Sequence, residues 1–314
     1  MDSGEKGEKA EKLGKKEKLE KKEEKGKLGR KLPGPEKVRT NSLSAPLTSI
    51  ALIAVTALVV YSNTLNGPFL FDDDWYVVNN VKIRDLGNFL DLSGTRYVTF
   101  LTFALNYYFG GLDPFGYHLA NIVIHMVNGL LVWWLVILTF RTPAMERTAG
   151  EPGLKYLVAL VAALIFVSHP IQTQAVSYIT QRFASLATLF YLLSLVLYVK
   201  WRFSRRWWLY AVSLLSAIVA MKTKEIAFTL PAMLCLYELA FFPREGFSKR
   251  LPALVPFLLT MAIIPLTYFA PEFGPELGIG EKGSDAAEKI RELNVLQMKT
   301  LSRYEYFATQ MRVI

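Results

Sequence analysis

Residues 183–221 read FASLATLFYLLSLVLYVKWRFSRRWWLYAVSLLSAIVAM, and this stretch decides the fold of the 314-residue chain. Two apolar runs flank a short loop that carries Lys200, Arg202, Arg205 and Arg206 together with three tryptophans. Long apolar runs of this kind are typical of transmembrane helices, and Trp, Lys and Arg concentrate at the ends of such helices. The stretch therefore predicts two antiparallel membrane spans joined by a basic turn.

The same pattern recurs along most of the chain, which is 52% hydrophobic. It predicts an all-α, polytopic transmembrane helical bundle of about seven spans, at residues 46–62, 117–140, 154–168, 183–200, 207–221, 226–242 and 251–270. Residues 1–45 are rich in Lys, Glu and Gly, so we expect a disordered cytoplasmic tail. We expect residues 46–270 to form the membrane domain and residues 271–314 an external amphipathic segment.

Basic residues also predict the orientation of the bundle, because Lys and Arg accumulate in short cytoplasmic loops. The loops near 141–155, 200–206 and 243–250 carry more of them than the alternate loops. This places the N-terminus in the cytoplasm and the large first loop, about 63–116, outside. An apolar segment of that loop, residues 96–110, is expected to be a helix at the membrane interface or packed on the bundle.

The net charge of +9 does not indicate nucleic-acid binding, because many basic residues lie in the N-terminal tail and most others flank apolar runs. The chain has one cysteine, Cys235, which excludes an intrachain disulfide.

An acidic cluster, Asp72-Asp73-Asp74, follows the first predicted span and lies between Phe71 and Trp75. One interpretation is a helix N-terminus in a solvated loop, where carboxylates are favoured by the helix dipole. The other is a site at the mouth of a membrane cavity, where a carboxylate acts as general base or binds a divalent cation.

A polar stripe runs through residues 116–128, where His118, Asn121, His125 and Asn128 are spaced 3, 4 and 3 residues apart. This spacing puts all four on one face of a helix. In a membrane span such a face should point into the bundle or into a watery cavity. Interhelical hydrogen bonding is the alternative to ligand binding. Zinc binding is disfavoured, because histidines two turns apart do not reach one ion.

Two further polar segments lie on the same predicted outer side. Residues 168–182 contain His169, Gln174 and Arg182, and residues 221–231 contain Lys224 and Glu225. For the first segment, the alternative to a site is a polar turn capped by His169. Lys224 in the second segment could bind a phosphate as a point charge, and the alternative is a lysine in a loop whose ammonium reaches the membrane surface. Together the segments predict one outward polar cavity for an anionic substrate with an apolar tail.

These segments resemble the membrane glycosyltransferases of the GT-C superfamily, in particular the protein O-mannosyltransferase-like group that often carries tetratricopeptide repeats. The stretches that carry the resemblance are FDDDWYVVNN (71–80), residues 101–128, HPIQTQAVSYITQR (169–182) with SLATLFYLLSLVLY, and MKTKEIAFTLP (221–231).

The resemblance implies transfer of a sugar, mannose or another hexose, from a polyprenyl-phosphate donor to an acceptor hydroxyl on a protein or glycan. It further implies inversion of the sugar, on the extracytoplasmic side. The paired acid of the group falls on Asp72 and Asp73, the expected catalytic residues, and Asn80 matches the asparagine that follows. Candidates for holding the leaving phosphate are Arg96, Arg182 and Lys224. The side chains expected to line the pocket are His118, Asn121, His125, His169, Gln174 and Glu225. No cofactor is implied, and a divalent cation remains an alternative.

The sequence departs from the group at Gln174, where some relatives have Glu, and at Arg96-Tyr97, which replaces a common Arg-Pro. Its end at TQMRVI, with no tetratricopeptide pattern, predicts either the N-terminal part of a longer enzyme or a truncated gene product. The expected location is a bacterial or archaeal cytoplasmic membrane, or the endoplasmic reticulum of a eukaryote. The alternative function is that of a non-catalytic transporter or lipid-binding scaffold that uses the same cavity.

Overall fold

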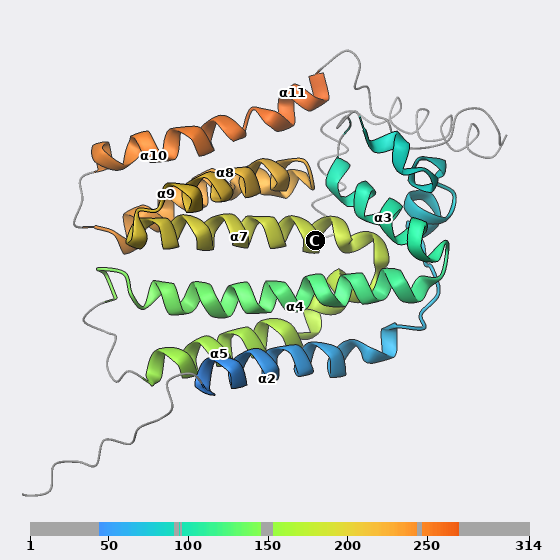
Figure 1. Ribbon diagram of the computed structural model, residues 1–314, viewed down its shortest axis with the longest axis horizontal. Helices are drawn as coiled ribbons and strands as arrows, with labels where there is room; N and C mark the ends of the chain where they lie inside the picture. The colour runs from blue at the N-terminus through green and yellow to red at the C-terminus, as the bar shows by residue number, and fades with distance from the viewer. Residues whose placement is uncertain (1–43, 91–93, 95, 146–152, 244–246, 270–314) are drawn as a thin grey trace, which may run out of the picture. The chain divides into compact units, whose positions relative to one another are not determined.

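The computed structural model of the chain describes residues 44–90, 94, 96–145, 153–243 and 247–269 (Figure 1). The chain divides into two compact units, Met1–Ala45 and Pro46–Ile314. The predicted tail lies almost wholly outside the described residues, and the predicted segment at 271–314 lies outside them entirely.

Helices account for all the regular structure of the described residues, and no strand occurs among them. This confirms the predicted all-α class. The α-helices are α2 (Ser44–Tyr61), α3 (Tyr97–Gly110), α4 (Pro114–Thr139), α5 (Leu154–Ser168), α6 (Thr173–Ser177), α7 (Arg182–Ser204), α8 (Trp207–Met221), α9 (Leu230–Phe241), α10 (Phe247–Thr260) and α11 (Ile263–Phe269).

Short 3-10 or π turns connect them: η1 (Ser62–Thr64), η2 (Asp74–Val78), η3 (Val81–Arg84), η4 (Leu86–Phe89), η5 (Pro170–Gln172), η6 (Ile179–Gln181) and η7 (Glu225–Thr229).

Four helical segments of the described residues are long and apolar enough to cross a membrane, namely Pro46–Thr64, Pro114–Thr139, Ile179–Ser204 and Arg250–Thr267. A fifth span results if α5 and the bent continuation Pro170–Ser177, inclined by 49°, are counted together. All seven predicted segments are helical, but α8 has only 15 residues and α9 only 12. The count of about seven spans therefore stays a prediction.

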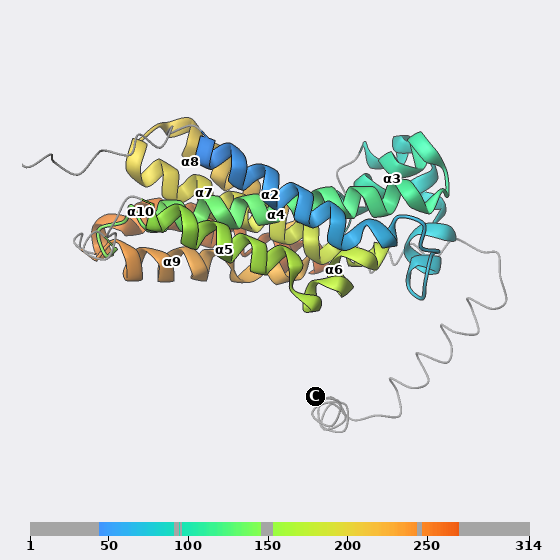
Figure 2. The ribbon, with the colours of Figure 1, turned by 90° about the horizontal axis from the view of Figure 1, so that it is seen from below.

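Close contacts between small and polar side chains bind the helices to one another. Ser194 of α7 and Ser213 of α8 donate to each other's backbone carbonyls at 2.9 and 2.7 Å. On the other side of the bundle, Gly129 of α4 leaves room for Val167 of α5 and Ile53 of α2. In Figures 1 and 2 the long helices α2, α4, α5 and α7 run side by side.

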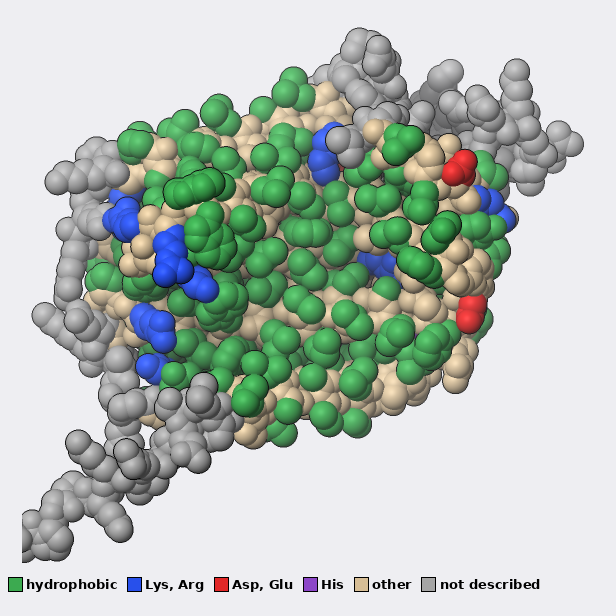
Figure 3. All heavy atoms as spheres, in the orientation of Figure 1, with side chains coloured by type: hydrophobic (Ala, Val, Ile, Leu, Met, Phe, Trp, Pro, Cys, Tyr) green, Lys and Arg blue, Asp and Glu red, His purple; other side chains and the backbone are tan. Residues whose placement is uncertain are grey.

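The outer faces of these helices are apolar. Val59 of α2, Leu157 of α5 and Leu215 of α8 are all exposed, and Figure 3 shows apolar side chains over the middle of the viewed face. Lys and Arg side chains gather at the end where α7 meets α8, whereas the visible Asp and Glu side chains lie toward the opposite end. This surface is that of an integral membrane protein.

The segment between α2 and α4 packs on an aromatic cluster. This cluster joins Val77, Ile83 and Phe89 to Phe100 and Phe103 of α3, and to Tyr117, Ile179 and Phe183. Phe100 meets Phe183 edge to face, with ring centroids 5.3 Å apart. The helix predicted at 96–110 is thus confirmed as α3, packed on the bundle; the outer location of this segment stays a prediction.

Candidate functional site

The acidic cluster begins in a tight turn, Leu70–Asp73, which we call the acidic turn. Asp73 donates its N–H to the carbonyl of Leu70 at 2.9 Å, and its carboxylate accepts the N–H of Leu70 at 3.0 Å. Its other oxygen accepts the N–H of Thr180 at 2.9 Å. Asp73 is therefore buried, and it fastens the acidic turn to the segment before α7.

Asp72 lies in the opposite environment, because its side chain is exposed. Its backbone N–H donates to the hydroxyl of Tyr178 at 2.8 Å, which fixes the residue from behind. The carboxylate of Asp72 makes no hydrogen bond to the described residues. Adjacent carboxylates thus differ: Asp72 is open to a ligand, and Asp73 is an internal anchor.

Burial raises the pKa of Asp73 above its usual value of 3.8, and this effect outweighs the hydrogen bonds from Leu70 and Thr180 and the charge of His118, which act in the opposite direction. A raised carboxyl pKa is the signature of a desolvated acid. Asp73 is therefore a carboxyl group whose protonated form is favoured by burial.

The polar stripe of α4 faces the bundle interior, as predicted, because all four of its residues are buried. Each contacts the backbone of a neighbouring segment: His118 the carbonyl of Gly67 at 3.1 Å, Asn121 that of Val176 at 3.2 Å, His125 that of Val167 at 3.1 Å and Asn128 that of Ser185 at 2.9 Å. The stripe thus binds helices together. Its predicted lining of a substrate pocket stays a prediction.

Arg182 is fully buried at the start of α7. Its guanidinium donates to Asn121 Oδ1 at 2.7 Å and Asn106 Oδ1 at 2.6 Å, and to the carbonyl of Tyr117 at 2.8 Å. It also lies 4.6 Å from the ring centre of Phe103. Its N–H groups point at protein acceptors on α3 and α4, so its predicted contact with a phosphate stays a prediction.

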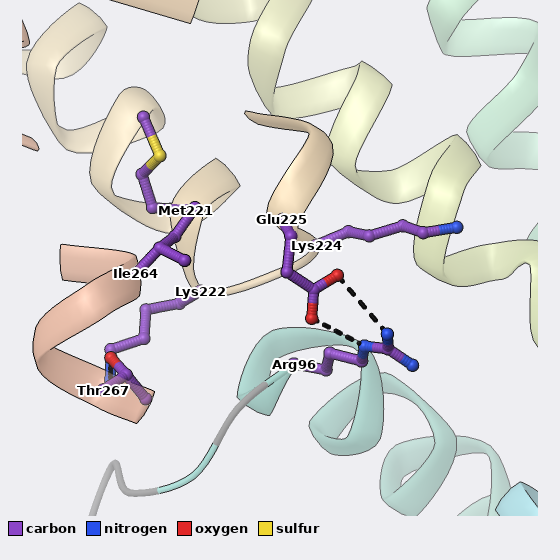
Figure 4. A pocket seen from close by; sticks show the side chains of 7 residues that line it. All are labelled: Arg96, Met221, Lys222, Lys224, Glu225, Ile264 and Thr267. Carbon is purple, nitrogen blue, oxygen red and sulfur yellow. Dashed lines mark hydrogen bonds and ion pairs between the residues drawn. The ribbon is translucent and has the colours of Figure 1, made fainter. Parts of the chain in front are cut away.

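A second polar group lines a small pocket, the Arg96 pocket (Figure 4), formed by Arg96, Met221, Lys222, Lys224, Glu225, Ile264 and Thr267. Arg96 binds Glu225 through Nε and an Nη, at 3.1 and 3.4 Å. Lys222 donates to Thr267 at 3.4 Å. Figure 4 shows Lys224 extending away from Lys222, on the side of Arg96 and Glu225.

The side chain of Lys224 is partly buried and makes no hydrogen bond or ion pair with the described residues. Burial lowers its pKa below 10.5, Arg96 lowers it further, and Glu225 acts in the opposite direction. An ammonium group in this setting gains from an added anion.

The aromatic cluster separates the acidic turn from the Arg96 pocket. The Arg96 guanidinium lies 5.3 Å from the ring centre of Phe183, and Tyr76, two residues after Asp74, meets the same ring at 5.3 Å. The Arg96 pocket is not lined by Asp72 or Asp73. The predicted residues thus fall into two groups, and the single polar cavity expected from the sequence stays a prediction.

Four other residues singled out in the sequence belong neither to the acidic turn nor to the lining of the Arg96 pocket. His169 is exposed at the end of α5, where its Nδ1 accepts the N–H of Ile171 at 3.2 Å, as expected for a capped polar turn. Gln174 is exposed on α6. His125 stacks on Phe166 and meets Tyr61 edge-on, between α2, α4 and α5. Asn80 is buried and caps η3 by accepting the N–H of Lys82 at 3.0 Å.

Within the described residues, no group of three or more His, Cys, Asp or Glu side chains is arranged to hold a metal ion.

The sequence interpretation missed Tyr178 and Thr180, which hold the acidic turn, and no local pattern marks them. It also missed a buried charge cluster, in which Glu238 of α9 meets Arg202 of α7 at 2.6 Å and Arg250 of α10 at 3.8 Å. The only signal for it was an acid inside an apolar run.

An apolar helical bundle with a buried polar stripe, an exposed carboxylate and a separate cationic pocket defines a membrane-embedded protein with polar sites. No family model matches the chain, and no solved structure matches it.

The chain is nevertheless a relative of the protein O-mannosyl-transferases, which confirms the resemblance predicted from its motifs. It is 32% identical over 214 residues to protein O-mannosyl-transferase Tmtc1 of Drosophila melanogaster, 62% of this chain and 23% of that protein. It is 33% identical over 232 residues to TMTC2 of Homo sapiens, 67% of this chain and 26% of that protein. With human TMTC4 it shares 28% identity over 231 residues, 65% of this chain and 31% of that protein. The chain thus spans between 23% and 31% of the length of these relatives.

Proposed function

We propose that this chain is the membrane-embedded part of a glycosyltransferase that moves a hexose, mannose in the first instance, from a polyprenyl-phosphate donor to a hydroxyl of an acceptor protein or glycan. The names of the relatives support mannose, a protein acceptor and an O-linkage. The carrier and the extracytoplasmic side come from the motif resemblance. The observation that carries the proposal is the exposed Asp72 carboxylate. It is held on a turn that is fixed by the buried side chain of Asp73 and by the hydroxyl of Tyr178.

Asp72 acts as the general base. It takes the proton of the acceptor hydroxyl as that oxygen forms a bond to C1 of the sugar. The bond between C1 and the phosphate oxygen breaks on the opposite face, so the product has inverted configuration. The electron pair of that bond leaves with the polyprenyl phosphate.

Asp73 is a positioning residue in this mechanism, because both of its oxygens already accept backbone N–H groups. Together with the bond from Asp72 N–H to Tyr178, it holds the base in one orientation. Fixing a catalytic group in its productive geometry lowers the barrier, since no ordering remains to be done in the transition state.

The Arg96 pocket receives the phosphate. Lys224 provides an ammonium without a protein partner among the described residues, and Arg96 is oriented by its paired bonds to Glu225. Positioned cations stabilise the negative charge that grows on a leaving phosphate. Arg182, the third predicted phosphate ligand, has a structural role instead, because its guanidinium joins α7 to α3 and α4.

We also propose that all seven predicted segments cross the bilayer, with the N-terminus in the cytoplasm. A helix of 15 residues, as in α8, is about 22 Å long and crosses where the bilayer is thinned by the protein. The 12 residues of α9 form a helix about 18 Å long, and the preceding 3-10 turn η7 extends this segment across the bilayer. The Lys and Arg side chains grouped at the α7–α8 end support the orientation (Figure 3).

Transfer can be measured with the chain purified into lipid nanodiscs, radiolabelled polyprenyl-phosphate mannose and an acceptor polypeptide rich in Ser and Thr. We expect Asp72→Asn to lower the rate by about 100-fold or more, the usual contribution of a general base. Asp74→Asn is the matched control, because Asp74 is also exposed and lies two residues away. Equal rates for the wild type and Asp72→Asn would refute the catalytic assignment. Donor binding without any transfer by the wild type would favour the non-catalytic lipid-binding alternative.

A further inference from the structure

Phe71 combines two features that are both unfavourable in the isolated protein. Its side chain is 82% exposed, and its backbone has a positive φ of 48°. The left-handed conformation is costly for a residue with a bulky side chain, and an exposed ring forgoes the gain from burial. Strained residues of this kind concentrate at functional sites, and Phe71 directly precedes Asp72.

The acidic turn enforces this conformation. It is closed by the N–H of Asp73 to the carbonyl of Leu70 at 2.9 Å and by the N–H of Asp74 to the carbonyl of Phe71 at 3.2 Å. While the side chain of Asp73 turns inward, the ring of Phe71 is directed outward. Tyr178 supports it edge-on, with ring centroids 6.4 Å apart and planes at 89°. Because the Tyr178 hydroxyl also accepts the backbone N–H of Asp72, one residue contacts the ring of Phe71 and holds the backbone of Asp72.

The combination of an exposed aromatic face and a neighbouring carboxylate fits a hexose. A hexose has faces of C–H groups, which are attracted to the electron-rich face of an aromatic ring. Its edge carries hydroxyl groups, which donate to a carboxylate. Insertion of Phe71 into the bilayer is the competing interpretation, and the exposed side chains of Asp72 and Asp74 oppose it, because they would be drawn toward the apolar phase.

We propose that Phe71 is the stacking surface for the sugar ring of the donor, and that it holds the hexose against Asp72. This inference rests on the proposed function and deepens it, because it assigns sugar recognition to a residue outside the predicted site.

The test uses three substitutions at Phe71 in the nanodisc-embedded chain. Phe71→Ala removes the ring and keeps the strained backbone, Phe71→Gly removes both, and Phe71→Trp keeps an aromatic face. Phe109→Ala is the matched control, because Phe109 is also 82% exposed. Donor KM and kcat are measured in the transfer assay, and binding of methyl α-mannopyranoside is measured independently by saturation-transfer NMR.

We expect Phe71→Ala and Phe71→Gly to raise the donor KM by about 2- to 12-fold, the equivalent of one aromatic contact, and to lose the NMR signal of the mannoside. Phe71→Trp and Phe109→Ala should resemble the wild type. If Phe71→Gly had the donor KM of the wild type while Phe71→Ala had a raised one, the backbone of the turn would matter and the ring would not, which would refute the proposal. Loss of stable membrane integration in Phe71→Ala, with unchanged mannoside binding, would support insertion into the bilayer instead.

The two failures are distinguishable. A wild type that transfers sugar normally but is insensitive to Phe71 refutes the stacking proposal and leaves the proposed function intact. A wild type that binds the mannoside through Phe71 but transfers nothing refutes the proposed function and leaves the stacking surface intact.

Discussion

Arg182 offers the sharpest test of how the helices are held together around the site. In Arg182→Met, Asn121, Asn106 and the Tyr117 carbonyl lose bonds of 2.7, 2.6 and 2.8 Å. An unsatisfied buried acceptor costs about 1–3 kcal/mol, and the loss is partly offset because a desolvated charge is removed. We therefore expect the free energy of unfolding to fall by about 3–5 kcal/mol.

The measurement is reversible unfolding in mixed micelles, followed by circular dichroism. Arg206→Met is the control, because Arg206 is exposed between α7 and α8, and it should change the free energy of unfolding by less than about 0.5 kcal/mol. In a double-mutant cycle, Arg182→Met and Asn106→Leu should be strongly non-additive, because the two side chains are bonded directly. A loss below about 1 kcal/mol in Arg182→Met, the size of one ordinary hydrogen bond, would refute this account of the network.

Three further predictions concern packing and protonation. Gly129→Ala should lower the free energy of unfolding by about 1–3 kcal/mol, because the added methyl group overlaps Val167; Val167→Ala should restore much of the loss in the double variant, and no rescue would contradict this packing. The raised pKa of Asp73 means that the folded state binds its proton more tightly than the unfolded state. The stabilisation by this proton is therefore complete below about pH 3.8 and is lost as the pH rises through the pKa of the folded state. The thermal midpoint of the wild type, relative to that of Asp73→Asn, should rise on acidification from pH 7 to 4. A fall of this relative midpoint would contradict the raised pKa. Because the pKa of Lys224 is lowered, kcat/KM should decline on the alkaline side of the pH profile, starting below pH 10.5. Lys224→Arg should move this decline to higher pH, since arginine keeps its charge. A decline at the same pH in Lys224→Arg would exclude Lys224 as its origin.

The helices of this protein are readable from the sequence because apolar runs act locally. Each predicted span is helical, and the spacing of His118, Asn121, His125 and Asn128 correctly indicated a face toward the interior. The lengths were less predictable, because turns decide them. Pro170 bends the continuation of α5, and η7 replaces the first turn of the span expected at 226–242.

The site was less accessible to sequence reasoning, because partners distant in the chain decide it. Nothing in three adjacent aspartates reveals that Asp73 is buried and accepts the N–H of Thr180, 107 residues away, while Asp72 is exposed. The pairing of Arg96 with Glu225 spans 129 residues. The positive φ of Phe71 follows from the closure of the turn rather than from its residue type, so composition alone could not indicate it.

The division of labour between Asp72 and Asp73 is most directly tested by measuring kcat and the thermal midpoint for Asp72→Asn and Asp73→Asn in the same nanodisc preparation. We predict that Asp72→Asn loses about 100-fold or more in kcat while its midpoint stays close to that of the wild type, because no described residue bonds its carboxylate. Asp73→Asn should lower the midpoint, because an amide NH₂ would face the N–H of Leu70 or Thr180. An Asp72→Asn variant that keeps full kcat, or an Asp73→Asn variant that keeps the wild-type midpoint, would contradict the account.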